Sequence, residues 1–79
     1  MSDQFTTDIR VRLGVAVRER RNELNISQED FAEQAGLHRT YISDLERGKR
    51  NVSIENVEKL AKALNLSISD LMKRVEVSN

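Results

Sequence analysis

The chain has 79 residues, of which 13 are basic and 13 acidic, so its formal net charge is zero. A chain of this length buries only about 60% of its unfolded surface and has room for one core, so we expect a single domain over residues 1–79. It has no cysteine, one histidine and no apolar run near the ~20 residues of a membrane span, which excludes a disulfide framework, a Cys/His zinc site and a membrane-spanning helix. We therefore expect a cytoplasmic protein that needs no cofactor or metal and has no membrane partner.

The first predicted helix covers about residues 7–24, where apolar residues recur at helical spacing. Thr6 or Thr7 can cap its start, because a hydroxyl accepts from an unpaired amide of the first turn. Gly14 lies inside this helix at a cost of about 1 kcal/mol relative to alanine, and a close helix crossing is the expected reason. Val11 and Val15 lie off the apolar face, where they either cover the C-terminal helix or are exposed to solvent.

Residues 28–48 have the residue types of a helix-turn-helix motif at fixed offsets. A small residue, Ala32, leaves room where two short helices cross steeply. Gly36 tolerates the left-handed conformation with which the chain leaves the first of these helices. The apolar positions of the motif are occupied by Phe31, Ala35, Leu37, Ile42 and Leu45. Agreement of this kind on both sides of a turn indicates a helix-turn-helix rather than one amphipathic helix.

Capping residues set the expected bounds of the remaining helices. Ser27 precedes a helix over about 28–35, and either Leu37 or His38 precedes one over about 39–46. Ser53 and Ser67 precede two amphipathic helices over about 54–64 and 68–75. No segment shows the alternation of a strand, so the sequence predicts an all-α protein of five helices.

The second helix of a helix-turn-helix enters the major groove of double-stranded DNA, while the first crosses the backbone. Residues 37–52 contain four basic and two acidic residues, whereas residues 27–36 contain three acidic and no basic ones. Arg39, at the start of the second helix, can donate to both guanine acceptors, O6 and N7. Thr40, Tyr41 and Ser43 can reach a base edge or a phosphate. The residues predicted to contact DNA are Gln28, Arg39, Thr40, Tyr41, Ser43, Asp44, Arg47, Lys49, Arg50 and Asn51.

Two of these residues could have a different role. Gln28 can add a side-chain donor to the free amides at a helix start, or it can simply begin the helix. Asp44 would repel phosphate, so it either accepts from cytosine N4 or stays clear of DNA and balances a neighbouring arginine. An enzyme is not expected, because the lone His38 has no cysteine or second histidine with which to form a catalytic pair or a metal site.

Residues 13–72 resemble the Cro-type helix-turn-helix of the phage-repressor and Xre family. Within that family, the segment HRTYISDLERGKRNVS is similar to the controller proteins of restriction-modification systems, including Val52 where many members have proline. The resemblance implies a five-helix, lambda-repressor-like DNA-binding domain and a transcriptional regulator. It also implies a structural ion pair between Arg21 and Glu46, which would remove Glu46 from the charge that faces DNA.

The resemblance further implies a homodimer that binds a near-palindromic operator, with RNA polymerase left open as a further partner. The family dimerises through its last helices, and the corresponding apolar face here consists of Ile68, Leu71, Met72 and Val75. A phage-type repressor or an antitoxin-like autoregulator would share this chemistry. The neutral net charge instead favours a protein interaction module that has kept the fold without binding DNA, whereas the basic residues 39–50 argue against it.

Overall fold

The computed structural model describes residues 8–77, and over this range the protein consists of five α-helices without a strand. The helices are α1 (Ile9–Glu23), α2 (Gln28–Ala35), α3 (Arg39–Glu46), α4 (Ile54–Ala63) and α5 (Ile68–Val77). The expected all-α, five-helix architecture is confirmed. Within the described range, no helix combines the length and the hydropathy needed to cross a bilayer.

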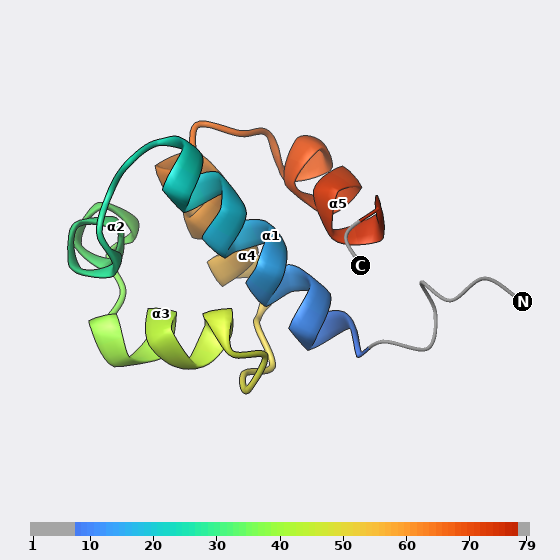
Figure 1. Cartoon of the computed structure of the whole chain (residues 1–79), viewed down its shortest axis with the longest axis horizontal. Helices are drawn as coiled ribbons and strands as arrows, with labels where there is room; N and C mark the ends of the chain where they lie inside the picture. The colour runs from blue at the N-terminus through green and yellow to red at the C-terminus, as the bar shows by residue number, and fades with distance from the viewer. Residues whose placement is uncertain (1–7, 78–79) are drawn as a thin grey trace, which may run out of the picture.

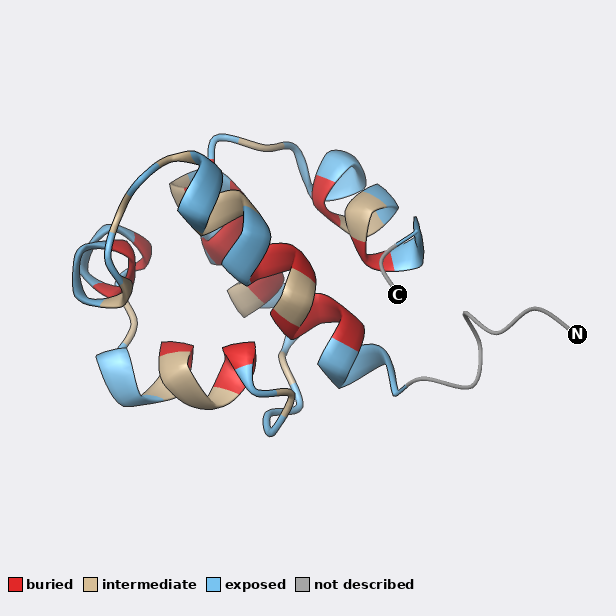
Figure 2. Cartoon of the chain, viewed as in Figure 1, coloured by how far each residue is buried: buried red, intermediate tan, exposed pale blue. Residues whose placement is uncertain are grey.

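The longest helix, α1, runs through the middle of the molecule and packs against α3 and α5 (Figure 1). The second helix contacts α3 and α4, and α4 in turn contacts α5. The buried positions of these helices turn toward one another, so that the core lies between them (Figure 2). Its largest fully buried side chains are Phe31, Ile42, Leu45, Leu60, Leu64, Leu71, Val17 and Val75.

Serine caps fix the start of three helices. The Oγ atoms of Ser27, Ser53 and Ser67 each accept from the backbone N–H three residues later, at 3.0–3.1 Å. The cap of α1 differs from the prediction, because it is Asp8, which accepts from the Arg10 amide at 2.9 Å. The same carboxylate pairs with the Arg10 guanidinium at 2.6 Å, which adds a reason for the helix to begin there. Thr6 and Thr7 lie outside the described residues.

The first four helices end in the same way, with one residue in the left-handed conformation. These residues are Asn25, Gly36, Gly48 and Asn65, with φ between 58° and 76°. The next amide then bonds to the carbonyl five residues back, as Leu37 N does to Ala32 O at 2.9 Å. This is the Schellman arrangement, which satisfies carbonyls that the helix leaves unpaired. At Gly36 no atom crowds a Cβ, so the positive φ itself explains the glycine.

Gly14 lies where α1 crosses the end of α3, as expected from its position inside a helix. A Cβ there would lie 2.5 Å from the Leu45 carbonyl oxygen and 2.8 Å from that of Glu46. Both are backbone atoms that cannot rotate away, so only glycine permits this approach. Val11 also contacts this region, because a Cβ at Gly48 would lie 2.8 Å from its Cγ2 atom. Val11 therefore contacts the loop after α3, and it remains 40% exposed.

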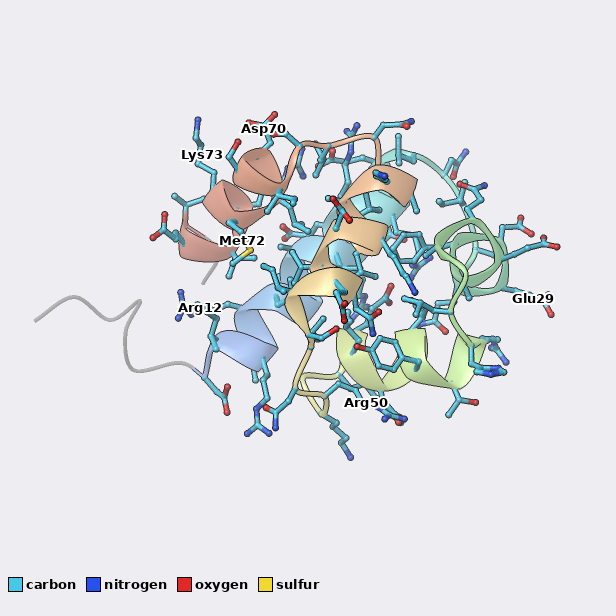
Figure 3. The ribbon with its side chains drawn as sticks, turned by 180° about the vertical axis from the view of Figure 1, so that it is seen from behind. Arg12, Glu29, Arg50, Asp70, Met72 and Lys73 are labelled. Atoms are coloured by element: carbon cyan, nitrogen blue, oxygen red, sulfur yellow. The ribbon has the colours of Figure 1, made fainter. Side chains whose placement is uncertain are left out.

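The apolar face of α5 belongs mostly to the core of the single chain, which corrects the prediction for two residues. Leu71 and Val75 are fully buried within one chain, so they have no surface to offer a partner. The reason is that α5 docks on α1 and α4, and the middle of its apolar stripe faces them. Ile68 is 38% exposed and Met72 is partly buried. Met72 points toward the body of the molecule, whereas Asp70 and Lys73 point away from it (Figure 3).

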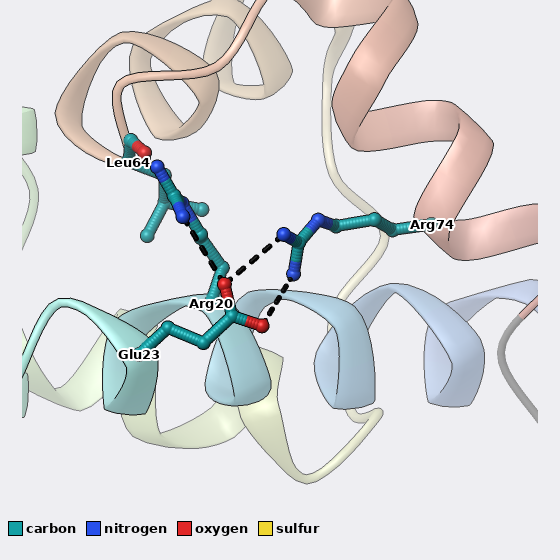
Figure 4. Close-up of polar contacts among 4 residues, drawn as sticks. All are labelled: Arg20, Glu23, Leu64 and Arg74. Atoms are coloured by element: carbon teal, nitrogen blue, oxygen red, sulfur yellow. Dashed lines mark hydrogen bonds and ion pairs between the residues drawn. The ribbon is translucent and has the colours of Figure 1, made fainter.

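A polar cluster ties α5 to the end of α1. Arg74 donates from both terminal nitrogens to the carboxylate of Glu23, at 2.9 and 3.0 Å (Figure 4). Arg20 donates to Glu23 at 3.1 Å and to the carbonyl of Leu64, at the end of α4, at 3.0 Å. The bonds from Arg74 and Arg20 hold the pKa of Glu23 at about 2. Glu23 thus joins α5 to α1, and Arg20 joins the end of α4 to the same cluster.

Candidate nucleic-acid interface

The ten residues predicted to contact DNA lie on α3, on the loop that follows it, and at the start of α2. Six of them are exposed, namely Arg39, Thr40, Arg47, Lys49, Arg50 and Asn51. The other four are half-buried: Gln28, Tyr41, Ser43 and Asp44. Three of the half-buried side chains, those of Gln28, Tyr41 and Asp44, are hydrogen-bonded to other residues.

A buried carboxylate connects the scaffold to the start of α2. The side chain of Glu46 is only 3% exposed and accepts from two nitrogens of Arg21, at 2.7 and 3.0 Å. The ion pair expected from the family resemblance is therefore present, and it raises the pKa of Arg21. Arg21 also donates to the carbonyl of Ile26, which lies between α1 and α2. The pair thereby fixes α1, α3 and the connection before α2 relative to one another.

Gln28 belongs to the same cluster. Its Nε2 donates to Glu46 Oε1 at 3.0 Å. A primary amide has two N–H groups, so one remains for a further acceptor. Gln28 is thus more than a residue that begins a helix, because Glu46 holds its amide in one orientation. A phosphate at the N-terminus of α2 would meet this donor together with the positive end of the helix.

Tyr41 and Arg50 join α3 to the following loop. The Arg50 guanidinium carbon lies 5.1 Å from the centre of the Tyr41 ring, which is within the range of a cation–π contact. The Tyr41 hydroxyl accepts from Nδ2 of Asn56, on the first turn of α4, at 3.1 Å. Figure 3 shows Arg50 at the edge of the molecule beside α3. Sequence reasoning does not single out Asn56, because its position three residues after Ser53 indicates only a helix start.

Asp44 accepts from two of the arginines on this surface. One carboxylate oxygen accepts a hydrogen bond from Arg47 Nη2 at 2.6 Å, and the other accepts one from Arg50 Nη2 at 3.2 Å. The hydrogen bond from Arg47 lowers the pKa of Asp44 by more than desolvation raises it. Of the two roles that the sequence left open for Asp44, its place in the structure matches the one in which it balances neighbouring arginines.

Two further cations of the surface differ from Arg47 and Arg50. Within residues 8–77, the side chains of Arg39 and Lys49 make no ion pair. Because Glu46 is buried against Arg21, the acid that α3 and its loop expose is Asp44 alone. Four exposed cations against one carboxylate make this surface more basic than the sequence count of four against two. The zero net charge of the chain thus conceals a basic face.

The short helices α2 and α3 contact each other and are joined by the turn over residues 36–38. Residues 17–71 match the family model described as helix-turn-helix. The chain belongs to the helix-turn-helix family. This span contains α2, α3, α4 and the first turn of α5, so it includes every residue of the candidate surface.

Control and controller proteins resemble most of the chain. The control protein C.BamHI of Bacillus amyloliquefaciens is 48% identical over 76 residues, covering 95% of this chain and 94% of the relative. The control protein C.SmaI of Serratia marcescens is 49% identical over 72 residues, covering 91% and 86%. The solved restriction-modification controller protein C.AhdI of Aeromonas hydrophila is 44% identical at a TM-score of 0.76, covering 78% of this chain and 94% of that one.

The chemistry of the helix-turn-helix surface is that of hydrogen-bond donors and positive charge. Among the described residues, no three His, Cys, Asp or Glu side chains are grouped to hold a metal ion. His38 is the N-cap residue of α3, and its side chain makes no capping bond. The amides of the first turn of α3 are consequently not covered by a side chain, unlike those of α2. Donors and positive charge are the chemical requirements for binding a nucleic acid.

Proposed function

We propose that this protein is a sequence-specific, DNA-binding transcriptional regulator of the controller type found in restriction-modification systems. The observation that carries the proposal is the exposed face of α3, where Arg39 and Thr40 lie at the helix start and no described carboxylate pairs with Arg39. A recognition helix reads base edges with its N-terminal residues. The similarity to control proteins over more than nine tenths of the chain supports the same function.

Each side chain has a role that follows from its place. Arg39 reads a guanine through two parallel hydrogen bonds, and Thr40 contacts the neighbouring base edge. Gln28 donates its second N–H to a phosphate beside α2. The loop residues reach the backbone on the far side of the groove, and this group consists of Arg47, Lys49, Arg50 and Asn51. The contacts of Arg39 and Thr40 with base edges specify the sequence, whereas the contacts with the DNA backbone fix the register.

The regulator acts as a homodimer on a near-palindromic operator. Burial of Leu71 and Val75 reduces the expected dimer face to Ile68 and the exposed part of Met72. Met72 also lines an apolar hollow together with Ile9 and Leu13 of α1. A two-fold dimer through this face would place two α3 helices about 34 Å apart, one turn of the duplex.

A DNA titration tests the function. The protein is titrated by fluorescence anisotropy against duplex DNA from upstream of its own gene and against a scrambled duplex of equal length and composition. We expect nanomolar affinity for the upstream duplex, at least about 10³-fold tighter than for the scrambled one at moderate salt. Equal affinity for the two duplexes would overturn the proposal and favour a protein interaction module.

A further inference from the structure

An acidic side chain is an unexpected component of a surface that binds phosphates. Asp44 lies in the second half of α3, on the same surface as Arg47 and Arg50 of the loop, and its side chain is 24% exposed. A carboxylate in this place repels DNA unless it has a compensating role. Its two ion pairs suggest what that role is.

Asp44 contributes to fixing the loop after α3 in two ways. Its backbone carbonyl accepts from the amides of Arg47 and Lys49, at 3.1 and 3.0 Å, which closes the turn at Gly48. Its carboxylate accepts from Arg47 and from Arg50, two residues beyond that turn. Arg50 is held a second time by the ring of Tyr41. The direction of both guanidinium groups is therefore set before any DNA arrives.

We propose that Asp44 is a specificity-determining positioning residue that acts through Arg47 and Arg50. Its carboxylate holds both guanidinium groups in place and withholds them from the phosphates of DNA of arbitrary sequence. The inference rests on the proposed function, because it concerns how the same surface separates operator from other DNA.

The physical reason is the difference between the two modes of binding. Non-specific binding comes almost entirely from cations that displace counterions from phosphates, and it favours side chains that are free to reach any of them. Each contact made by Arg47 or Arg50 in that mode requires an ion pair with Asp44 to break. Specific binding uses cations at fixed positions and gains from side chains that are already oriented. Asp44 therefore weakens non-specific binding more than specific binding.

Asp44→Asn tests the proposal, because it removes the charge and keeps the shape. We expect binding to the scrambled duplex to strengthen by up to about tenfold, since each exposed ion pair affects an equilibrium by less than about fivefold. The salt slope on that duplex should steepen by about one unit. Affinity for the upstream duplex should change much less, so discrimination falls. Asp44→Ser repeats the measurement with a second uncharged side chain. Asp44→Glu keeps the carboxylate and should therefore discriminate between the two duplexes as the wild type does.

Two controls establish whether Asp44 acts through the two arginines. Glu58→Gln removes one carboxylate from an exposed site on α4 and should leave both affinities and the salt slope unchanged. In an Arg47→Ala/Arg50→Ala background, Asp44→Asn should have little further effect. An undiminished effect there would overturn the proposal, because it would mean that Asp44 repels DNA directly.

The remaining outcomes are also decisive. Equal weakening of both duplexes by Asp44→Asn would assign Asp44 a purely structural role, and an unchanged discrimination ratio would show that the ion pairs do not affect specificity. Either result overturns the inference and leaves the proposed function intact, because the wild type would still prefer its upstream duplex. A wild type that fails to prefer that duplex would overturn the proposed function and this inference together.

Discussion

Glu46 shows how one buried side chain can orient a residue of the candidate surface. It accepts from Arg21 and from Gln28, so the amide of Gln28 is oriented by an ion pair that lies outside the candidate surface. Removal of Glu46 would leave the Arg21 guanidinium, whose side chain is 12% exposed, without its carboxylate. An uncompensated buried charge is strongly destabilising. A loss of DNA binding on mutation of Glu46 would therefore report on folding, not on contact with DNA.

Arg39 offers a cleaner test of base recognition, because its side chain is exposed and has no ion pair in the described part of the chain. Arg39→Ala should cost roughly 1–3 kcal/mol of binding free energy and relax the preference at one base pair. Binding to a set of operator duplexes, each with one substituted base pair, measures this. Arg50→Ala should instead weaken every duplex in the set and lower the salt slope by about one unit. Uniform weakening by Arg39→Ala would reassign Arg39 to the phosphate backbone.

The ion pairs of Asp44 could be suspected from the sequence but not established. Arg47 lies three residues after Asp44, directly after the last residue of α3, and side chains at this helical spacing meet. Arg50 is six residues away, and it reaches Asp44 only because Gly48 turns the chain back in the left-handed conformation. The glycine predicts a helix end, but the direction of the returning loop depends on what packs against it. Here that includes Val11, from a distant part of the chain.

At the scale of the helices, starts follow closely from the sequence because caps are local. A serine followed by acidic or amide residues gives the beginning of α2, α4 and α5, and each of these hydrogen bonds spans three residues. The start of α1 follows less closely, since the sequence predicts Thr6 or Thr7 as the cap and the cap is Asp8. Burial is harder to predict than helicity, because the spacing of the α5 stripe does not show which of its residues lie innermost.

The attachment of α5 to α1 should depend on pH. The pKa of Glu23 is lowered to about 2 by Arg74 and Arg20, from an ordinary value of 4.5. Because the folded protein holds the ionised form, this contribution to stability is present above the ordinary pKa and is lost as the pH falls from about 4.5 toward 2. Thermal unfolding midpoints of the wild type should therefore fall more steeply across this window than those of Glu23→Gln.

Protonation of Asp8 also lowers stability over this pH range, since the pKa of Asp8 is also about 2. Asp8 is present in the wild type and in Glu23→Gln, so it contributes equally to the pH dependence of both. Glu58→Gln serves as the matched control and should keep the steep dependence of the wild type. The same acid sensitivity in Glu23→Gln and the wild type would show that the contact with Arg74, on the surface of the molecule, contributes nothing measurable to stability.

At the scale of the whole molecule, a small core and a partly exposed α5 together favour assembly. Leu71 lies in the core and Ile68 on the surface of the same helix, so substitution of Leu71 tests folding and substitution of Ile68 tests dimer formation. Leu71→Ala should cost about 2–5 kcal/mol of unfolding free energy through the cavity that it leaves, whatever the oligomeric state. Loss of a dimer in that variant would say nothing about the interface. The dimer face has to be tested at Ile68.

Ile68→Glu should separate the subunits without unfolding them. Ile68 is the first residue of α5, after its serine cap, where an acidic side chain suits the positive end of the helix. In a dimer the same charge would be buried against its own copy, which is unfavourable. Sedimentation at micromolar concentration should show a dimer for the wild type and a monomer for Ile68→Glu, with unfolding still cooperative. Operator binding should weaken, although every residue of the candidate surface is retained.

Val77→Glu provides the control on the same helix. Val77 is 71% exposed and lies nine residues after Ile68, which places it on the opposite side of a helix of about 3.6 residues per turn. This variant should remain dimeric and bind the operator as the wild type does. A wild type that sediments as a strict monomer and still binds its operator tightly would exclude the dimer. Dissociation by Val77→Glu instead of Ile68→Glu would place the two-fold axis on the other face of α5, and the half-site spacing would then follow from a dimer through that face.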